Sequence, residues 1–252
     1  IDMVNSNRDK AESYATELGE ILSKHLESGD SLLDVGTGEI TTLTLILNKL
    51  DIELTDILAL DISWSRLSVG VKFHKENRKS KFPLKPFVAD IKEIPLHKKC
   101  VDVVISMHAL EPNGKNLGIF LCELFRVTKK KLLLFEPSYE LNSEEGKARM
   151  DKLGYIKDIT GKVSELGGSI LGVIPINNVV NPLNPTACYI IEPPRQDMEH
   201  LETVSFCVPG TSFKLEADGG FLFSKDTGLA FPVLDEIPVL KTASAILATS
   251  KC

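Results

Sequence analysis

This chain lacks several features that would assign it quickly to a class of protein. Its 252 residues include one tryptophan and five cysteines, and no two cysteines stand at the C-x-x-C spacing of a zinc or redox site. We therefore expect no metal site, and reduced thiols in a cytoplasmic protein. The sequence opens on no basic-then-apolar leader and contains no run of about 18 apolar residues, so neither export nor a membrane span is expected.

An excess of positive charge is also missing. The formal net charge is −6, which gives no basic footprint for a phosphate backbone and disfavours nucleic acid as a substrate. Hydrophobic residues make up 43% of the chain and charged residues 25%, as in ordinary globular proteins. The length suits one α/β domain with a good core and a small appendage.

The most informative stretch is Ser31–Ile40, with the sequence SLLDVGTGEI. Apolar residues that favour a buried strand run into Gly36-Thr37-Gly38, and a helical apolar pattern follows at once. A strand, a glycine turn and a helix let a ligand approach the backbone closely, and free N–H groups at the helix start favour an anionic or polar ligand. The stretch predicts a site for a nucleotide-like cofactor.

Two cofactor classes use such a turn. A dinucleotide fold expects a third glycine where this chain has Thr41. The sequence D-V-G-T-G, with Asp34 two places before the first glycine, instead resembles the first motif of the class I S-adenosylmethionine (SAM)-dependent methyltransferases. Those enzymes often carry a third glycine where this chain has Ile40, so the match departs from the family there.

Acidic residues follow the next two predicted strands. Asp61 ends one of them, where a carboxylate can accept hydrogen bonds from both ribose hydroxyls; its alternative role is an acid at a helix start. The resemblance implies that Asp90, after the following strand, receives the adenine amino group, and that Tyr14 covers the cofactor unless it is simply a core residue. The cofactor residues implied in this way are Tyr14, Asp34, Gly36, Thr37, Gly38, Asp61, Ile62, Asp90, Ile91 and Met107.

Strand and helix patterns alternate along most of the chain. This alternation predicts an α/β fold with a doubly wound, mostly parallel sheet and a ligand crevice at the strand carboxyl ends. The resemblance implies seven strands, the last two forming a reversed hairpin, and a SAM-binding domain over residues 1–192. Helices are expected at 8–26, 40–50, 63–77 and 116–126, and the closing strands at 169–176 and 187–191.

Residues that follow the fourth and fifth strands are candidates for catalysis. His108 lies just past the fourth strand, and an unperturbed histidine suits a general base near neutral pH. We expect Glu111 and Tyr139, from neighbouring loops, to orient His108 or the methyl acceptor. The alternative is that His108 only contacts the cofactor or fills the loop.

A change in composition at residues 193–197 marks the start of a C-terminal appendage. Short strand-like runs at 204–208, 213–216 and 221–223 lead to Gly228–Leu240, which resembles the end of small zinc-ribbon-type methyltransferase activator subunits. Those ribbons bind zinc with two C-x-x-C pairs. Here only Cys207 is present, and Gly210, Ser224 and Thr227 occupy the other three positions. We expect a metal-free ribbon-like domain over residues 198–246, or an unrelated β extension.

The sequence therefore predicts a SAM-dependent methyltransferase whose acceptor could be a small molecule, glycan, protein or RNA. Two enzyme alternatives stay open, a nicotinamide-dependent oxidoreductase and an aminopropyl transferase. A third alternative is a SAM-binding pseudoenzyme that acts as a scaffold or activator for another protein. The oligomeric state is not predicted.

Overall fold

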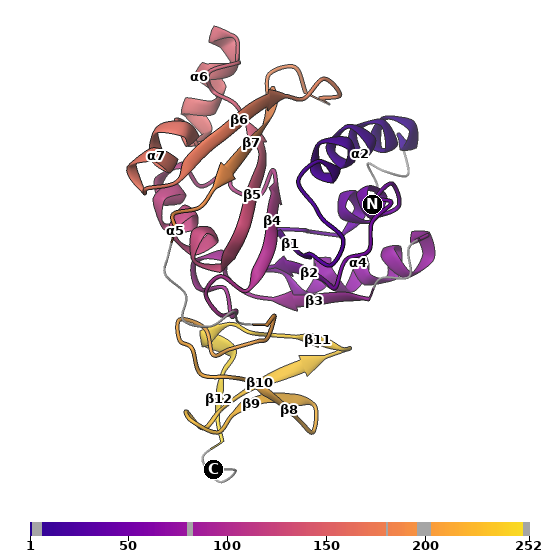
Figure 1. The fold of residues 1–252 in the computed structure, drawn as a ribbon, viewed down its shortest axis with the longest axis vertical. Coiled ribbons are helices and arrows are strands. Elements are labelled where there is room, and N and C mark those ends of the chain that lie inside the picture. Colours follow the sequence, from indigo (N-terminus) through magenta and orange to yellow (C-terminus); the bar gives the residue numbers. More distant parts are fainter. Residues whose placement is uncertain (2–6, 80–82, 180, 196–202, 249–252) are drawn as a thin grey trace.

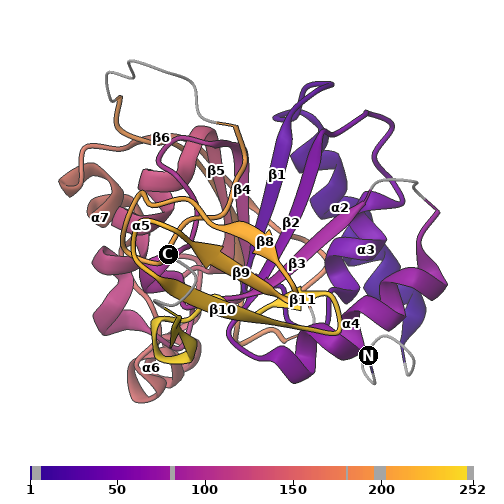
Figure 2. The same ribbon diagram turned by 90° about the horizontal axis from the view of Figure 1, so that it is seen from below.

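A computed structural model describes residues 1, 7–79, 83–179, 181–195 and 203–248. It contains a large α/β domain and, beyond one edge of its sheet, a small β domain (Figure 1). Helices cover both faces of the large sheet (Figure 2). Each face has its own buried apolar cluster, so the sheet is the middle layer of three.

The large sheet has seven strands in the order β3-β2-β1-β4-β5-β7-β6. The first five strands pair in parallel, and β7 and β6 close the sheet in antiparallel fashion. The doubly wound, mostly parallel fold that the sequence predicts is thus confirmed. The strands are β1 (Ser31–Val35), β2 (Asp56–Asp61), β3 (Leu84–Val88), β4 (Val101–Met107), β5 (Thr128–Pro137), β6 (Ser169–Pro175) and β7 (Thr186–Glu192).

Six α-helices surround this sheet in the described part of the chain. Two of them start at serine caps: Ser63 accepts a hydrogen bond from the Arg66 N–H, and Ser143 accepts one from the Gly146 N–H. Such caps fix where the chain leaves each strand-end loop. The helices are α2 (Arg8–Ser23), α3 (Thr41–Leu47), α4 (Trp64–Asn77), α5 (Leu117–Val127), α6 (Glu144–Leu153) and α7 (Ile159–Glu165).

The helix behind the glycine turn is shorter than the sequence predicts. It begins at Thr41 because Ile40, its N-cap residue, has a φ of 56° and so lies in the left-handed region. A β-branched residue rarely adopts this conformation, which glycine adopts freely. Ile40 is fully buried in the cluster that α2 and α3 cover, and this burial offsets the backbone strain.

The small domain is an antiparallel sheet of short strands. Its order is β11-β10-β9-β8, and β12 pairs with β10. The predicted strand at 204–208 is wrong, because Phe206 and Cys207 make only single bridges, to Leu96 and Lys214. The strands are β8 (Glu216–Asp218), β9 (Phe221–Ser224), β10 (Leu229–Leu234), β11 (Ile237–Pro238) and β12 (Ile246–Leu247). The predicted domain start at residue 198 lies outside the described residues.

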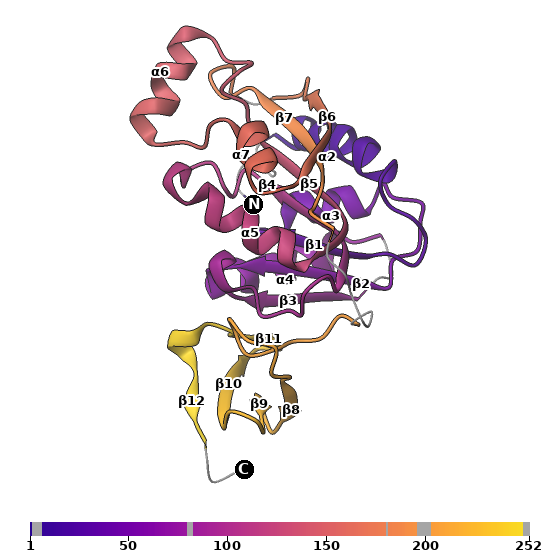
Figure 3. The same ribbon diagram turned by 60° about the vertical axis from the view of Figure 1, so that its left-hand side comes forward.

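The small domain packs against the β3 edge of the large sheet (Figure 3). The Leu240 N–H donates to the Val88 carbonyl at 2.7 Å, and Val239 forms a parallel bridge with Val88. The Phe206 ring meets Phe87 edge-on, with 5.1 Å between ring centroids. Residues of both domains belong to one buried apolar cluster. An edge strand that would otherwise expose unpaired backbone is covered in this way.

We predict that the two domains unfold as one unit. Leu240→Ala should remove a side chain that is fully buried in the shared cluster and lower the free energy of unfolding by about 2–5 kcal/mol. For a chain of this size, that loss corresponds to a drop in Tm of roughly 5–15 °C. Calorimetry should show a single transition that moves as a whole.

Leu247→Ala is the matched control, because Leu247 belongs to the same domain and is 70% exposed. Its Tm should stay close to that of the parent chain. A second, separate transition that alone responds to Leu240→Ala would contradict the coupling of the two domains.

Candidate functional site

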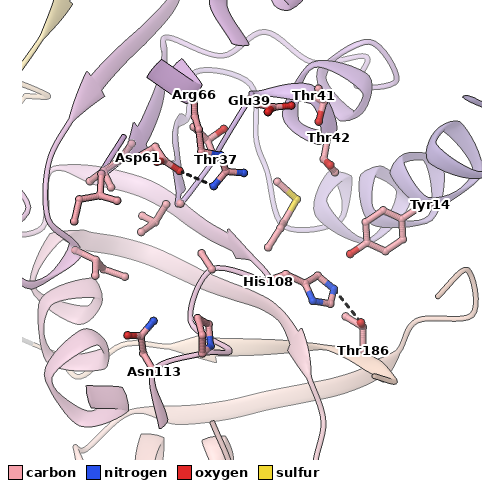
Figure 4. Close-up of a pocket in the computed structure, with 18 of the residues that line it drawn as sticks. Tyr14, Thr37, Glu39, Thr41, Thr42, Asp61, Arg66, His108, Asn113 and Thr186 are labelled. Atoms are coloured by element: carbon pink, nitrogen blue, oxygen red, sulfur yellow. Dashed lines mark hydrogen bonds and ion pairs between the residues drawn. The ribbon is translucent and has the colours of Figure 1, made fainter. Parts of the chain in front are cut away.

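A cavity of about 820 Å³ opens at the carboxyl ends of the central strands (Figure 4). Its volume lies within the range of roughly 300–1,000 Å³ that is typical of small-molecule sites. The glycine turn after β1 and the acids after β2 and β3 line one part of it. The loop after β4, helix α2 and the start of β7 line the other part. The cavity therefore brings together residues from the first and the last segments of the large domain's sequence.

The glycine turn contributes shape more than free hydrogen-bond donors. The N–H groups of Gly36 and Thr37 donate to the Leu60 carbonyl, and the Gly38 N–H donates to Asp61 Oδ2 at 2.8 Å. This corrects the expectation that these groups are free for an anionic ligand. Gly36 has a φ of 75°, and a Cβ there would lie 2.1 Å from the Cβ of Ala109. Glycine is required because the turn lies directly against the loop after β4.

Asp61 joins the turn to the start of helix α4. Besides the Gly38 N–H, its carboxylate accepts a hydrogen bond from the Ser63 N–H at 2.9 Å. Arg66 Nη1 lies 3.7 Å from Asp61 Oδ2, so a guanidinium that the sequence analysis missed also lines this part of the cavity. A carboxylate has about four lone-pair directions, so Asp61 keeps acceptor capacity for ligand hydroxyls.

Five other predicted cofactor residues line the same cavity: Tyr14, Ile62, Asp90, Ile91 and Met107. Asp90 Oδ1 accepts the Lys92 N–H at 2.9 Å and begins the short 3-10 helix η1 (Ile91–Glu93). Ile62 is 57% exposed although it is apolar, which is expected of a residue that a flat ligand covers. The Tyr14 hydroxyl is buried without a hydrogen-bond partner and points into the cavity in Figure 4.

Asp34 does not line the cavity, which corrects its prediction as a cofactor-binding residue. Its carboxyl group is fully buried behind the turn. Burial raises the pKa of Asp34 to about 7, with Thr37 opposing the shift and the Asp61 charge adding to it. Gly38 is likewise absent from the cavity wall and acts through its bond to Asp61.

Glu136, to which the sequence analysis gave no role, holds the loop after β4 in place by hydrogen bonds. Glu136, at the end of β5, is fully buried, and its Oε1 accepts hydrogen bonds from the Ala109 and Leu110 N–H groups, each at 3.1 Å. The Ser106 hydroxyl donates to the same oxygen at 3.0 Å, while Oε2 has no partner. Burial raises the pKa of Glu136 to about 7, although nearby His108 opposes the shift.

His108 begins this loop in a left-handed conformation, with a φ of 55°. Its Nδ1 lies 2.9 Å from Glu111 Oε2, and its Nε2 lies 3.0 Å from Thr186 Oγ1. Asn184 Nδ2 donates to the same Glu111 oxygen at 3.2 Å. Burial disfavours the imidazolium, but the hydrogen bond to Glu111 and the charges of Glu136 and Glu111 outweigh it and raise the pKa of His108. The imidazole ring is therefore held between Glu111 and Thr186.

Tyr139 takes no part in this arrangement, which corrects its predicted role. Its hydroxyl donates to Asp151 Oδ2 at 3.3 Å, on helix α6. The ammonium groups of Lys157 and Lys147 lie 5.2 and 5.9 Å from its ring centroid. The Tyr139 side chain therefore contacts residues on and just after α6, and it does not line the cavity.

Some of the residues that the sequence analysis missed had a recognisable signal in the sequence, and others had none. Glu136 carries the same signal as Asp61 and Asp90, an acid at the end of a predicted strand, and could have been found by it. Asn184 lies in a turn rich in asparagine and proline, and Thr186 follows this turn. Neither residue has a local signal in the sequence. Only the antiparallel return of β7 beside β5 brings these two residues to His108.

Comparison with known proteins agrees with the fold. Residues 33–135 match a family model described as a methyltransferase domain. No curated protein is a sequence match for the chain. The matched segment runs from within β1 to within β5 and includes the glycine turn, so this part of the sheet domain is similar to a methyltransferase domain.

Similar solved structures have the same fold at low sequence identity. A SAM-dependent methyltransferase from Methanosarcina mazei has a TM-score of 0.58 at 14% identity, over 70% of this chain and 98% of its own. A second similar chain comes from the complex of the Haloferax volcanii Trm112 methyltransferase activator with a methyltransferase. It has a TM-score of 0.59 at 15% identity, and the match covers 76% of this chain and 95% of that chain. Magnesium protoporphyrin IX methyltransferase from Synechocystis, with bound S-adenosylhomocysteine (SAH), has a TM-score of 0.58 at 12% identity. The match covers 76% of this chain and 88% of that chain.

Two features are absent from the part of the chain that the structure describes. No helix there combines the length and apolar character that crossing a bilayer requires. Among the same residues, no group of three or more histidine, cysteine, aspartate or glutamate side chains is placed to hold a metal ion.

We predict that Asp61→Ala weakens SAH binding. The substitution removes the acceptor for ligand hydroxyls and frees the turn at Gly38, and it should cost about 1.5–3 kcal/mol, or about tenfold or more in Kd. Asp56→Ala is the control at the opposite end of β2, where the side chain only pairs with Lys85 at the surface. Calorimetry should separate the two variants, and equal affinities would contradict the assignment of Asp61.

The buried carboxyl groups should make stability fall as pH rises. A pKa near 7 in the folded state means that the folded chain keeps a proton that the unfolded chain releases above about pH 4.5. We expect the free energy of unfolding to be higher at pH 5.5 than at pH 8, by on the order of 2 kcal/mol for each group. Glu136→Gln, which keeps an acceptor oxygen, should reduce this difference in chemical denaturation. An unchanged pH dependence would show that Glu136 titrates normally.

Proposed function

We propose that the protein transfers a methyl group from SAM to an acceptor that enters the same cavity. The observation that carries the proposal is the arrangement of the cavity, with the glycine turn and strand-end acids in one part and the His108–Glu111 pair in the other. The family match over residues 33–135 supports the choice of cofactor. When bound, SAM supplies an electrophilic methyl group on a sulfonium.

The residues present suit this cofactor. Gly36 and Thr37 line the cavity, and glycine at position 36 avoids a side chain that would collide with Ala109. We assign Asp61 to the ribose hydroxyls and Asp90 to the adenine side, with Ile62 and Ile91 against the ring. Each assignment uses a group that already lines the cavity and keeps free hydrogen-bonding or apolar surface.

His108 is the general base in this proposal. Methyl transfer neutralises a positive charge, so the protein mainly positions the two reactants and removes a proton from the acceptor. The carboxylate of Glu111 holds the imidazole and stabilises the imidazolium that forms. Burial raises the pKa of Glu111, but the hydrogen bond and charge of His108 and the hydrogen bonds of Asn184 and Tyr155 together outweigh it, so the pKa is lowered and Glu111 is charged at neutral pH.

The small C-terminal domain is, in our proposal, a metal-free activator-like domain fused to its own methyltransferase domain. Its end resembles the zinc-ribbon-type activator subunits, and one similar structure comes from a complex with the Trm112 activator. Its backbone bond to Val88 lies two residues before Asp90, so it supports the strand that leads to the adenine side of the cavity. Within this proposal, no separate activator subunit is needed at that edge.

Ligand-dependent stabilisation tests the cofactor assignment against the alternatives. SAM and SAH should raise Tm, whereas NAD and decarboxylated SAM should not. A preference for NAD would indicate an oxidoreductase, and a preference for decarboxylated SAM would indicate an aminopropyl transferase. SAM binding without methyl transfer to any fraction of a cell extract would indicate a pseudoenzyme.

We predict that His108→Asn lowers kcat by roughly a hundredfold while SAH affinity stays nearly unchanged. Asparagine tolerates the positive φ of this position better than most residues, so the loop should keep its shape. In the unsubstituted protein, kcat should rise with pH through an apparent pKa above the ordinary histidine value of about 6.5. His25→Asn, outside the cavity, is the control. Full activity of His108→Asn across pH 6 to 9 would leave positioning as the whole mechanism.

A further inference from the structure

The two ring nitrogens of His108 have defined and different partners. Glu111 is charged and can only accept, so Nδ1 carries the proton of the neutral ring and donates to Glu111 Oε2. Nε2 of the neutral ring is then an acceptor, and the hydroxyl of Thr186, 3.0 Å away, must donate to it. The other possible acceptor for this hydroxyl, the Asn184 carbonyl, is 3.4 Å away and therefore weaker.

This geometry has a consequence for the base. The lone pair of His108 that can accept a proton faces Thr186 and not the open cavity (Figure 4). Thr186 lines the cavity, although only 2% of its surface is exposed. Once its own hydrogen points to His108, the Thr186 oxygen has a lone pair free to accept a hydrogen bond from the cavity side.

The space around Thr186 contains two more buried polar atoms that lack partners. The Tyr14 hydroxyl is one, and Asn184 Oδ1 is the other. Both residues line the cavity, and Figure 4 shows the Tyr14 side chain facing it from helix α2. Buried polar atoms without partners are costly. A ligand hydroxyl can accept from the Tyr14 hydroxyl and donate its one hydrogen to Thr186 Oγ1, and a second donor on the same ligand would satisfy Asn184 Oδ1.

The charges around this space disfavour an anionic acceptor. Burial raises the pKa of Tyr14, and the carboxylates of Glu136, Glu17 and Glu111 raise it further. The same negative field would repel a carboxylate or phosphate placed beside Tyr14. Lys10 lines the cavity from α2, and the other lysine and arginine side chains of its wall, Lys92 and Arg66, lie with the acids after β3 and β2. The space is suited to a neutral group.

We propose that the space between Tyr14, Asn184 and Thr186 binds the hydroxyl group of a neutral alcohol or phenol, and that Thr186 relays its proton to His108. The proposal rests on the proposed methyltransferase function and names the acceptor class for it. As the acceptor oxygen bonds to the methyl carbon, the carbon–sulfur bond breaks and its electron pair stays on sulfur. The acceptor's proton passes to Thr186 Oγ1 while the Thr186 proton passes to Nε2. The products are an O-methyl ether, a neutral thioether and an imidazolium paired with Glu111.

Thr186→Val and Thr186→Ser test the relay as a matched pair, because valine keeps the shape of threonine and serine keeps the hydroxyl. In the SAH complex, ¹⁵N NMR should show a hydrogen-bonded Nε2 in the parent chain and in Thr186→Ser. In Thr186→Val, the same signal should move to that of a free imidazole nitrogen. An Nε2 signal that does not differ between the two variants would overturn the relay geometry.

Turnover separates a relay from a merely structural role. With labelled SAM and a small-molecule cell extract as acceptor mixture, Thr186→Val should lose about tenfold or more in kcat, and Thr186→Ser should keep most of it. The double variant Thr186→Val/His108→Asn should lose no more than His108→Asn alone, because both residues serve one proton path. SAH affinity should be the same in all variants. Full kcat in Thr186→Val alongside an inactive His108→Asn would overturn the relay and leave the proposed function intact.

The chemistry of the product tests the acceptor class separately. An O-methyl ether keeps its label in mild alkali, and mass spectrometry should show a neutral product. Methyl esters, which release labelled methanol in alkali, or N-methylated products would overturn the hydroxyl assignment. Failure of the unsubstituted protein to bind SAM or SAH would instead refute the proposed function on which the inference rests.

Discussion

The buried carboxylate of Glu136 holds together the two parts of the cavity. One of its oxygens accepts three hydrogen bonds, from the Ser106 hydroxyl and from the Ala109 and Leu110 N–H groups. Ala109 lies against Gly36, so the same loop that carries His108 also forms one side of the glycine turn. Moving this loop would therefore disturb the glycine-turn part and the His108 part of the cavity together, because both are built on one set of backbone contacts.

The second constraint lies at the edge of the sheet. β3 is an edge strand of the large sheet, and unpaired edges are sites of unwanted association. The small domain covers this edge with the Leu240–Val88 hydrogen bond and with apolar contacts shared by both domains. Because Asp90 and Ile91 follow directly after β3, the stability of the small domain and the shape of the cavity depend on each other.

The polar groups of the cavity are arranged asymmetrically. In the cofactor part, Asp61 satisfies backbone groups of the turn and keeps capacity for a ligand. In the acceptor part, the Tyr14 hydroxyl and Asn184 Oδ1 have no partner, and the imidazole of His108 points its acceptor nitrogen at Thr186. The first part is preorganised by the protein itself, whereas the second leaves hydrogen bonds for an acceptor to complete.

The sequence alone determined the fold class and several of the residues that line the cavity. Alternating strands and helices, the Gly36–Gly38 turn and the strand-end acids Asp61 and Asp90 are local signals, and parallel strands place their carboxyl ends at one edge. Local pattern could not show that Asp34 faces the core, that Ile40 adopts a positive φ, or that Tyr139 bonds to Asp151. Nor could it bring Thr186 to His108, 78 residues earlier in the chain, or Asn184 to Glu111, 73 residues earlier. Those contacts depend on the pairing of β7 with β5, and only the tertiary structure fixes which side chains that pairing brings together.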